Sequence, residues 1–169
     1  DVRKIFKGIF KRILTDARDI QIEPEYIAGK TFQAGVCHWA CMYLDVEIAR
    51  LMFKTPGVEV NRLDKEYKTG AAKLIEKKDK EVVPMLEFLY SQGFNFNTRK
   101  DEKSQSLLES FLTAISKNYQ AIEFIVNHGA DVNVYHSRQC DKKGNRMTLI
   151  EFVREKGDSK LKKIFGLTK

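Results

Sequence analysis

The stretch Ile122-Glu-Phe-Ile-Val-Asn-His-Gly-Ala-Asp-Val-Asn133 decides the fold, because its layout occurs three times in the chain. Residues 86–92 lead in the same way to Gly93 and Asn97, and residues 48–56 lead to Gly57 and Asn61. The closing asparagines of neighbouring copies are 36 residues apart in both intervals. A fixed period of this length predicts a repeat protein, in which each copy buries its apolar side against the next copy.

Each copy is predicted to contain a helix that ends at its glycine. Glycine adopts the left-handed backbone conformation that other residues resist, and many helices end on it. After Gly93 and Gly129, apolar residues alternate with Asp or Asn, so that apolar side chains point inward and polar ones hydrogen-bond the turn. We therefore expect Phe94 or Phe96 to be buried and His128 to cap the carbonyl groups of its helix.

These residues resemble the ankyrin repeat, whose second helix ends in a GADVN-like turn and whose first helix opens with a TPLH-like tetrapeptide. Residues 129–133 match the first pattern letter for letter, and residues 35–41, Gly-Val-Cys-His-Trp-Ala-Cys, keep the histidine and the small residues of the second. The resemblance covers about residues 34–165. It implies an all-α fold, an ankyrin-repeat solenoid with an N-terminal helical extension (1–33), three divergent repeats (34–140) and a C-terminal capping repeat (141–169).

The chain departs from the family pattern in its second and third repeats. Residues 70–75 can serve as the first helix of repeat two, but a charged insertion follows at 76–81, and repeat three opens with 107–111 in place of the usual tetrapeptide. The period of 36 also exceeds the family's 33 or so. We therefore expect long fingers between the repeats, at 62–69, 98–106 and 134–145.

The first residues form a separate feature. Apolar residues at positions 2, 5, 6, 9, 10, 13, 14, 17 and 20 fall on one half of a helix, which is expected to pack on repeat one as a cap. Trp39 is expected to lie buried against that cap. The chain starts with Asp1 and not with Met, so we expect it to be a trimmed piece of a longer protein.

The length and composition of the chain predict a globular protein with no membrane span. With 169 residues and 43% hydrophobic content, the chain can form one domain with its own core. No stretch approaches the roughly 20 apolar residues of a membrane span. Three cysteines are few and odd in number, which fits a reducing compartment, so a cytoplasmic location is expected.

The net charge of +7 is concentrated at the two ends, with +4 in residues 1–14 and +6 in residues 136–169. Such ends are an alternative binding site for nucleic acid or an anionic membrane. Capping helices, however, carry charge on their outer faces simply to remain in solution. No aromatic residues interleave with the basic ones on a polar face, as a platform for single strands requires, so neither nucleic acid nor membrane is the expected partner.

The cysteines and histidines are the candidate residues for a metal site or a catalytic site. Cys37, His38 and Cys41, with His136 and Cys140 far along the chain, lack the short paired intervals of a zinc site. Cys37 or Cys140 as a nucleophile lacks a third orienting group, and there is no P-loop, G-x-S-x-G or H-E-x-x-H motif. We expect these residues to pack, and we expect no metal, no cofactor and no enzymatic activity.

The expected function is therefore that of a monomeric, non-catalytic module that binds a partner protein through its concave face and fingers. The contact residues implied by the family's variable positions are Tyr43, Arg62, Asp64, Lys65, Lys100, Asp101, Tyr135, Arg138 and Arg146. The irregular repeats look like those of ankyrin proteins that intracellular bacteria or viruses place in host cells. The partner would then be a host protein, and the chain would be the ankyrin domain of a larger secreted effector.

Overall fold

The structure is a computed structural model that describes residues 36–43, 45–54, 58–64, 66–75, 77 and 80–168. The expected N-terminal helix, Gly57 and Lys65 lie outside these residues, and the side chains of Trp39 and Tyr43 are likewise not described. The chain divides into two compact units. Unit 1 comprises residues 1–74 and 79–94, unit 2 comprises residues 75–78 and 95–169, and each unit is described by itself.

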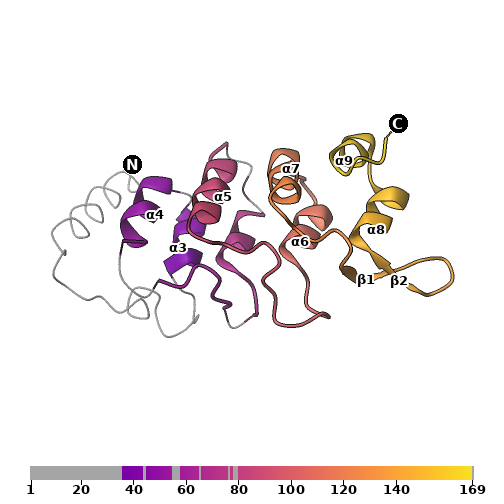
Figure 1. Cartoon of the computed structure of the whole chain (residues 1–169), viewed down its shortest axis with the longest axis horizontal. Coiled ribbons are helices and arrows are strands. Elements are labelled where there is room, and N and C mark those ends of the chain that lie inside the picture. Colours follow the sequence, from indigo (N-terminus) through magenta and orange to yellow (C-terminus); the bar gives the residue numbers. More distant parts are fainter. Residues whose placement is uncertain are drawn as a thin grey trace. The chain divides into compact units, whose positions relative to one another are not determined.

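Unit 1 contains three α-helices and one 3₁₀ helix among its described residues (Figure 1). These are α3 (Val36–Tyr43), α4 (Val46–Met52), the 3₁₀ helix η1 (Gly70–Leu74) and α5 (Val82–Ser91). Helix α3 packs on both η1 and α4, and α4 also contacts α5. The helix expected at 70–75 is therefore present, but as a short 3₁₀ helix. The core of the unit includes Cys37, Cys41, Ala49, Leu74, Met85 and Leu89, all of which are buried.

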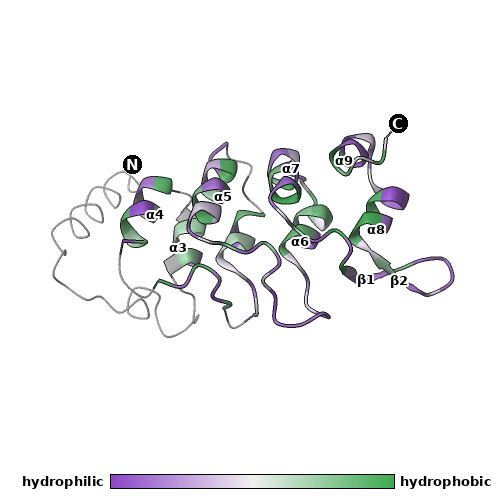
Figure 2. Cartoon of the chain, viewed as in Figure 1, coloured by the Kyte–Doolittle hydropathy of each residue, from purple (hydrophilic) through white to green (hydrophobic). Residues whose placement is uncertain are grey.

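Unit 2 contains four α-helices and two strands among its described residues. These are α6 (Leu107–Thr113), α7 (Tyr119–Asn127), β1 (Tyr135–Cys140), β2 (Arg146–Thr148), α8 (Leu149–Lys156) and α9 (Ser159–Ile164). Each helix begins at a polar side chain that accepts a backbone N–H of the first turn: Ser106, Asn118, Thr148 and Asp158. The apolar sides of the helices form the core, which includes Leu108, Phe111, Ile122, Ile125, Leu149 and Val153 (Figure 2).

The expectation of an all-α solenoid is wrong, because β1 and β2 form a two-stranded antiparallel sheet. Tyr135 lies opposite Thr148 and Cys140 lies opposite Arg146, with a bulge between the two pairs. The long finger expected at 134–145 thus supplies one whole strand and a turn. His136 and Met147 lie in the core, whereas Tyr135 is exposed. This alternation of buried and exposed side chains is typical of a strand, so these residues can pair. The fold is accordingly mixed α and β.

Two of the three glycines expected to end helices do so, and the third, Gly57, lies outside the described residues. Gly93 and Gly129 follow α5 and α7 with φ angles of +83° and +92°. In both turns the residue after the glycine donates its N–H to the carbonyl of the residue five positions earlier, over 3.0 Å from Phe94 to Leu89 and 3.2 Å from Ala130 to Ile125. The two copies therefore share one helix-ending motif. Phe94 and Phe96 are both buried, as expected for at least one of them.

The closing asparagine of a copy connects it to the next glycine turn. Within unit 1, Asn61 Nδ2 donates to the carbonyl oxygen of Gly93 over 3.1 Å. Within unit 2, Asn97 Nδ2 donates to the carbonyl oxygen of Gly129 over 2.9 Å, and Asn97 Oδ1 accepts the N–H of Asp131 over 2.8 Å. The spacing of 36 residues in sequence thus corresponds to a repeated contact between turns.

Replacing Gly129 tests the helix-ending turn. We expect Gly129→Ala to lower the free energy of unfolding by about 1–2 kcal/mol, because a side chain resists the positive φ. An added Cβ would meet no atom within 4 Å, so the loss is conformational and not steric. Gly129→Asn should lose less, since Asn tolerates this conformation better. Urea unfolding followed by circular dichroism checks both variants, and equal losses for Ala and Asn would contradict the conformational cause.

None of the helices in the described part of the chain has both the length and the apolar composition needed to cross a bilayer.

Candidate partner-binding hairpin

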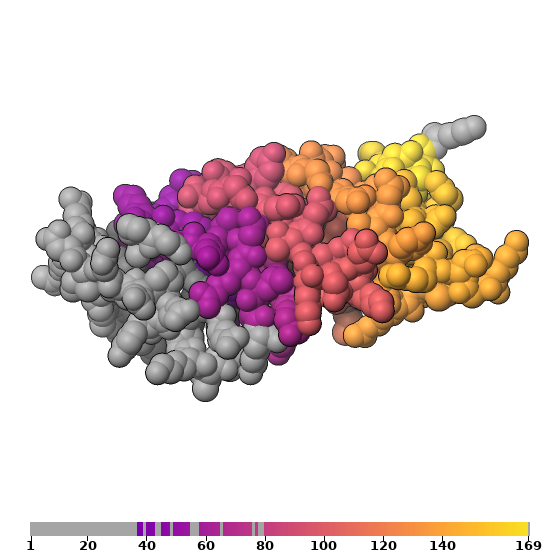
Figure 3. All heavy atoms as spheres, turned by 60° about the horizontal axis from the view of Figure 1, so that its bottom comes forward, coloured from indigo at the N-terminus to yellow at the C-terminus, as the bar shows by residue number. Residues whose placement is uncertain are grey.

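The hairpin formed by residues 135–148 brings together three of the residues predicted to bind a partner. Tyr135 and Arg138 lie on β1, and Arg146 lies on β2; all three are exposed. On the opposite face, His136 and Met147 are buried in unit 2. The hairpin therefore has one face in the core and one face toward solvent, and its tip stands clear of the rest of unit 2 in the space-filling view (Figure 3).

An aromatic and an arginine side chain are stacked on the outer face. The guanidinium carbon of Arg146 lies 4.9 Å from the centroid of the Tyr135 ring, and Tyr135 remains 52% exposed. Such a cation–π contact holds the guanidinium against the ring, while the N–H groups at the edge of the guanidinium stay accessible. Tyrosine and arginine are also the side chains that most often dominate the energy of protein interfaces.

The turn of the hairpin is organised by Asp141. One of its carboxylate oxygens accepts the backbone N–H groups of Lys143 and Asn145, over 2.8 and 2.9 Å, and the other accepts Asn145 Nδ2 over 3.1 Å. These bonds from Asn145 and Lys143 hold the pKa of Asp141 below its ordinary value. The turn leaves Lys142 and Lys143 exposed at a strongly hydrophilic tip (Figure 2).

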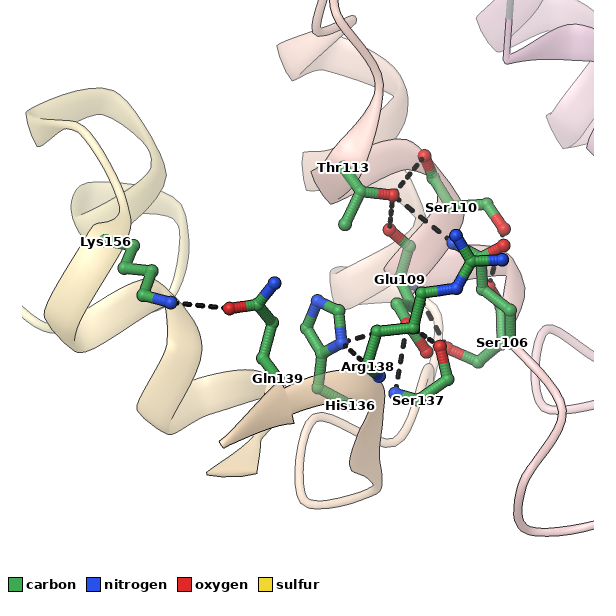
Figure 4. Close-up of polar contacts among 10 residues, drawn as sticks. Ser106, Glu109, Ser110, Thr113, His136, Ser137, Arg138, Gln139 and Lys156 are labelled. Carbon is green, nitrogen blue, oxygen red and sulfur yellow. Dashed lines mark hydrogen bonds and ion pairs between the residues drawn. The ribbon is translucent and has the colours of Figure 1, made fainter. Parts of the chain in front are cut away.

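The base of the hairpin is held by a buried carboxylate on α6. Glu109 is only 1% exposed, and its Oε1 atom accepts both the backbone N–H of Ser137, over 3.0 Å, and the hydroxyl of Ser137 (Figure 4). The same oxygen lies 3.0 Å from Nδ1 of His136. A second tie comes from α8, where Lys156 Nζ donates to Gln139 Oε1 over 2.5 Å. Helices α6 and α8 thus both fix β1.

His136 is buried and packs beside Glu109. Burial lowers the pKa of His136; the nearby carboxylate of Glu109 opposes this, and the charges of Lys156 and Arg138 add to it. Its ring lies 4.7 Å from the ring of Phe152, centroid to centroid. Its Nδ1 accepts the backbone N–H of Arg138 over 3.1 Å and lies beside Glu109 Oε1, while Nε2 is buried without a hydrogen-bond partner among the described residues.

Glu109, His136 and Ser137 have the composition of a hydrolase triad but not its geometry. In such a triad the histidine lies between the acid and the serine, and one ring nitrogen accepts the proton of the nucleophile. Here the Ser137 hydroxyl donates directly to the Glu109 carboxylate, and the second ring nitrogen of His136 is buried. The arrangement holds a strand in place and does not activate a nucleophile.

The finger at 98–106 belongs to unit 2 and contains two more of the predicted residues. Asp101 accepts the N–H groups of Lys103 and Ser104 and the hydroxyl of Ser104, over 2.8–3.0 Å. The Ser104 hydroxyl is the main cause of the lowered pKa of Asp101. Asp101 therefore shapes its own loop, whereas Lys100 is an exposed side chain of that loop.

The prediction that Asp64 contacts a partner is corrected. Asp64 is 7% exposed, and its Oδ1 accepts the backbone N–H groups of Glu66 and Lys68 over 2.8 and 3.0 Å. These hydrogen bonds close the finger at 62–69, so the carboxylate is not exposed for contact with a partner. Arg62 in the same finger is half-buried, and Lys65 and the side chain of Tyr43 lie outside the described residues.

Cys37, Cys41 and His38 occupy packing positions, whereas the expectation that Cys140 packs is wrong. Cys37 and Cys41 are buried free thiols, Cys140 is an exposed one, and burial raises the pKa of Cys41, which opposes its use as a nucleophile. His38 is fully buried, with Nε2 2.9 Å from the carbonyl oxygen of Lys68. His128 caps its helix as predicted, with Nδ1 2.8 Å from the carbonyl oxygen of Phe124.

The most important residue missed by sequence reasoning is Glu109. Its signal is a single acid within Leu107-Leu-Glu-Ser-Phe-Leu112, where apolar residues flank it on both sides. A carboxylate in such a run is buried only where donors surround it. Those donors come from Ser137 and His136, 28 and 27 residues further along the chain, and no local pattern identifies them.

His38 makes unit 1 sensitive to acid. Burial lowers the pKa of His38; the Lys68 carbonyl and Asp64 oppose this, whereas Lys73 and Arg62 add to it. Its Nδ1 is buried and has no hydrogen-bond partner among the described residues, so protonation there places an unsatisfied N–H in the core. Because the folded pKa lies below the unfolded one, this stability is present above about pH 6.5 and is lost as pH falls through the folded pKa.

The variant His38→Gln checks this sensitivity, since the Gln amide can still donate to Lys68 but does not titrate. We expect urea unfolding to show a smaller loss of stability between about pH 7.5 and about pH 5.5 for the variant than for the unmodified chain. His136 contributes equally to both proteins, so the difference reports His38. An identical loss in both would contradict the assignment.

Compared with known proteins, the chain matches no protein-family model and no curated protein.

Proposed function

We propose that the chain is a non-catalytic protein-binding module, similar to ankyrin repeats in its repeated turns, and that the outer face of the hairpin is its main contact surface. The observation that carries this proposal is the convergence of Tyr135, Arg138 and Arg146 on one exposed hairpin with a buried anchor. Side chains on a fixed support lose less freedom on binding than those on a loose loop.

In unit 2, the residues that hold the hairpin in place differ from those on its outer face. Glu109 and His136 hold the strand from the core side, and Asp141 closes the turn from within. The outer side chains can therefore vary in identity without changing the support, which is the property that lets repeat proteins bind different partners. Lys100 and the finger at 98–106 provide further exposed side chains of the same unit.

We further propose that the module works as a monomer in the cytoplasm, and in a host cell if the chain is part of a secreted effector. The free thiols at positions 37, 41 and 140 fit a reducing compartment. A binding role for the basic ends, toward nucleic acid or an anionic membrane, is the competing function. Among the described residues, that function depends on the basic side chains of the terminal helices α8 and α9.

Quantitative affinity capture from a eukaryotic cell lysate tests the proposal with two matched variants. The first replaces Tyr135, Arg138 and Arg146 by Ala, and the control replaces Lys162 and Lys163 of α9 by Ala. We expect specific proteins to be captured by the unmodified chain and by the control, and to be lost from the hairpin variant. Loss with the α9 control but not with the hairpin variant would overturn the proposal. Circular dichroism confirms that both variants fold.

A further inference from the structure

We infer that the outer face of the hairpin recognises an acidic protein segment, in which Asp or Glu carboxylates pair with its arginines and lysines. This inference rests on the proposed function and specifies the chemistry of the partner. It follows from the charge of the hairpin, from the stacking of one arginine and from what the hairpin lacks.

The charge of the hairpin is strongly positive and is not neutralised by the part of the chain that the structure describes. Residues 135–148 carry four basic side chains and one acidic side chain. The basic ones are Arg138, Lys142, Lys143 and Arg146, all exposed. The carboxylate of Asp141 accepts hydrogen bonds from its own turn, and none of the four cations forms an ion pair within the described residues. A surface of this kind attracts carboxylates and favours fast association.

The side chain of Arg146 is preorganised to bind a carboxylate. Its stacking on Tyr135, at 4.9 Å, restricts the orientation of the guanidinium group before any partner arrives. A guanidinium offers forked donors that match the two oxygens of a carboxylate, a geometry that lysine cannot reproduce. Since the orientation is already restricted, less freedom is lost on binding.

The hairpin lacks the features that the other anionic partners need. Tyr135 is the only Phe, Tyr or Trp of residues 135–148, and its ring already stacks with Arg146, whereas single strands of nucleic acid need a series of open aromatic faces. Met147, the largest apolar side chain of β2, is buried, so it cannot insert into a bilayer. The observations therefore favour an acidic protein segment.

Fluorescence anisotropy of the full chain with a fluorescein-labelled peptide of alternating Glu and Ser tests the inference. The variants are Arg146→Lys, Arg146→Gln and Tyr135→Leu, and Lys163→Gln on α9 is the control that removes one charge elsewhere. We expect Arg146→Gln and Arg146→Lys each to weaken binding about ten-fold, Tyr135→Leu to weaken it several-fold, and the control to change it less than about two-fold.

Three results would overturn the inference: no binding of the acidic peptide at low salt, unchanged affinity of Arg146→Lys, or tighter binding of single-stranded DNA or phosphatidylserine vesicles than of the peptide. Failure here is separable from failure of the proposed function. If the hairpin variant still loses its captured proteins but the peptide does not bind, only the acidic partner is wrong. If the hairpin variant captures the same proteins as the unmodified chain, the contact surface itself is wrong.

Discussion

Glu109→Ala is expected to lower the free energy of unfolding by about 3–5 kcal/mol, because each donor left without its acceptor costs about 1–3 kcal/mol. The change leaves the N–H and hydroxyl of Ser137 without their acceptor and leaves His136 without its partner, all inside unit 2. It also leaves a cavity on α6, which adds to the loss. Urea unfolding followed by circular dichroism measures it.

A matched variant separates the carboxylate's hydrogen bonds from its volume. Glu109→Gln keeps an oxygen that can accept from Ser137 and keeps the size of the side chain, so we expect it to lose only about 1–2 kcal/mol. Hydrogen–deuterium exchange should show faster exchange of the amides of residues 135–140 in the Ala variant than in the Gln variant. Equal stability of the two variants would contradict the anchoring role of Glu109.

Gly70→Ala is expected to be the most damaging single change in unit 1, with a loss of about 3 kcal/mol, at the upper end for overpacked sites. A Cβ atom at this position would lie 2.6 Å from the Cys37 sulfur and 2.7 and 2.8 Å from the backbone carbonyl carbon and oxygen of Cys37. The contact between η1 and α3 therefore requires glycine, and the added methyl forces the two helices apart. Fluorescence of Trp39, the only tryptophan, and circular dichroism follow the unfolding.

Two further variants make this prediction specific. Ala72→Gly removes a Cβ from a half-buried position of the same 3₁₀ helix and should cost no more than about 1 kcal/mol. The double variant Gly70→Ala with Cys37→Ala removes the sulfur contact but not the two backbone contacts, so it should recover only part of the stability. Full recovery in the double variant would show that backbone approach is not the cause.

The parts of the fold that could be predicted from the sequence are those that depend on short local patterns of residues. The glycines at 93 and 129 end their helices because only a residue without a side chain accepts the backbone conformation there at low cost. The helix expected from residues 107–111 is present as α6, and the last copy contains α8 and α9 as expected. Each of these features depends on residues within a few positions of one another.

The parts that could not be predicted depend on contacts between distant residues. The family resemblance implied an all-α fold, yet residues 135–140 form a strand because β2 and Glu109 offer partners for its backbone. The family's variable positions imply a contact role for Asp64, but its carboxylate turns inward to close the finger at 62–69. Tyr135 and Arg146 lie on different strands, and only the pairing of these strands, with Tyr135 opposite Thr148, stacks them on one face of the hairpin.

Crosslinking mass spectrometry of the chain bound to a captured protein, with a lysine-reactive crosslinker, tests the proposed contact surface most directly. The account predicts crosslinks from Lys142 and Lys143 at the tip of the hairpin, and from Lys100 and Lys103 in the finger beside α6. Crosslinks confined to the lysines of α9, with none from the hairpin, would contradict it.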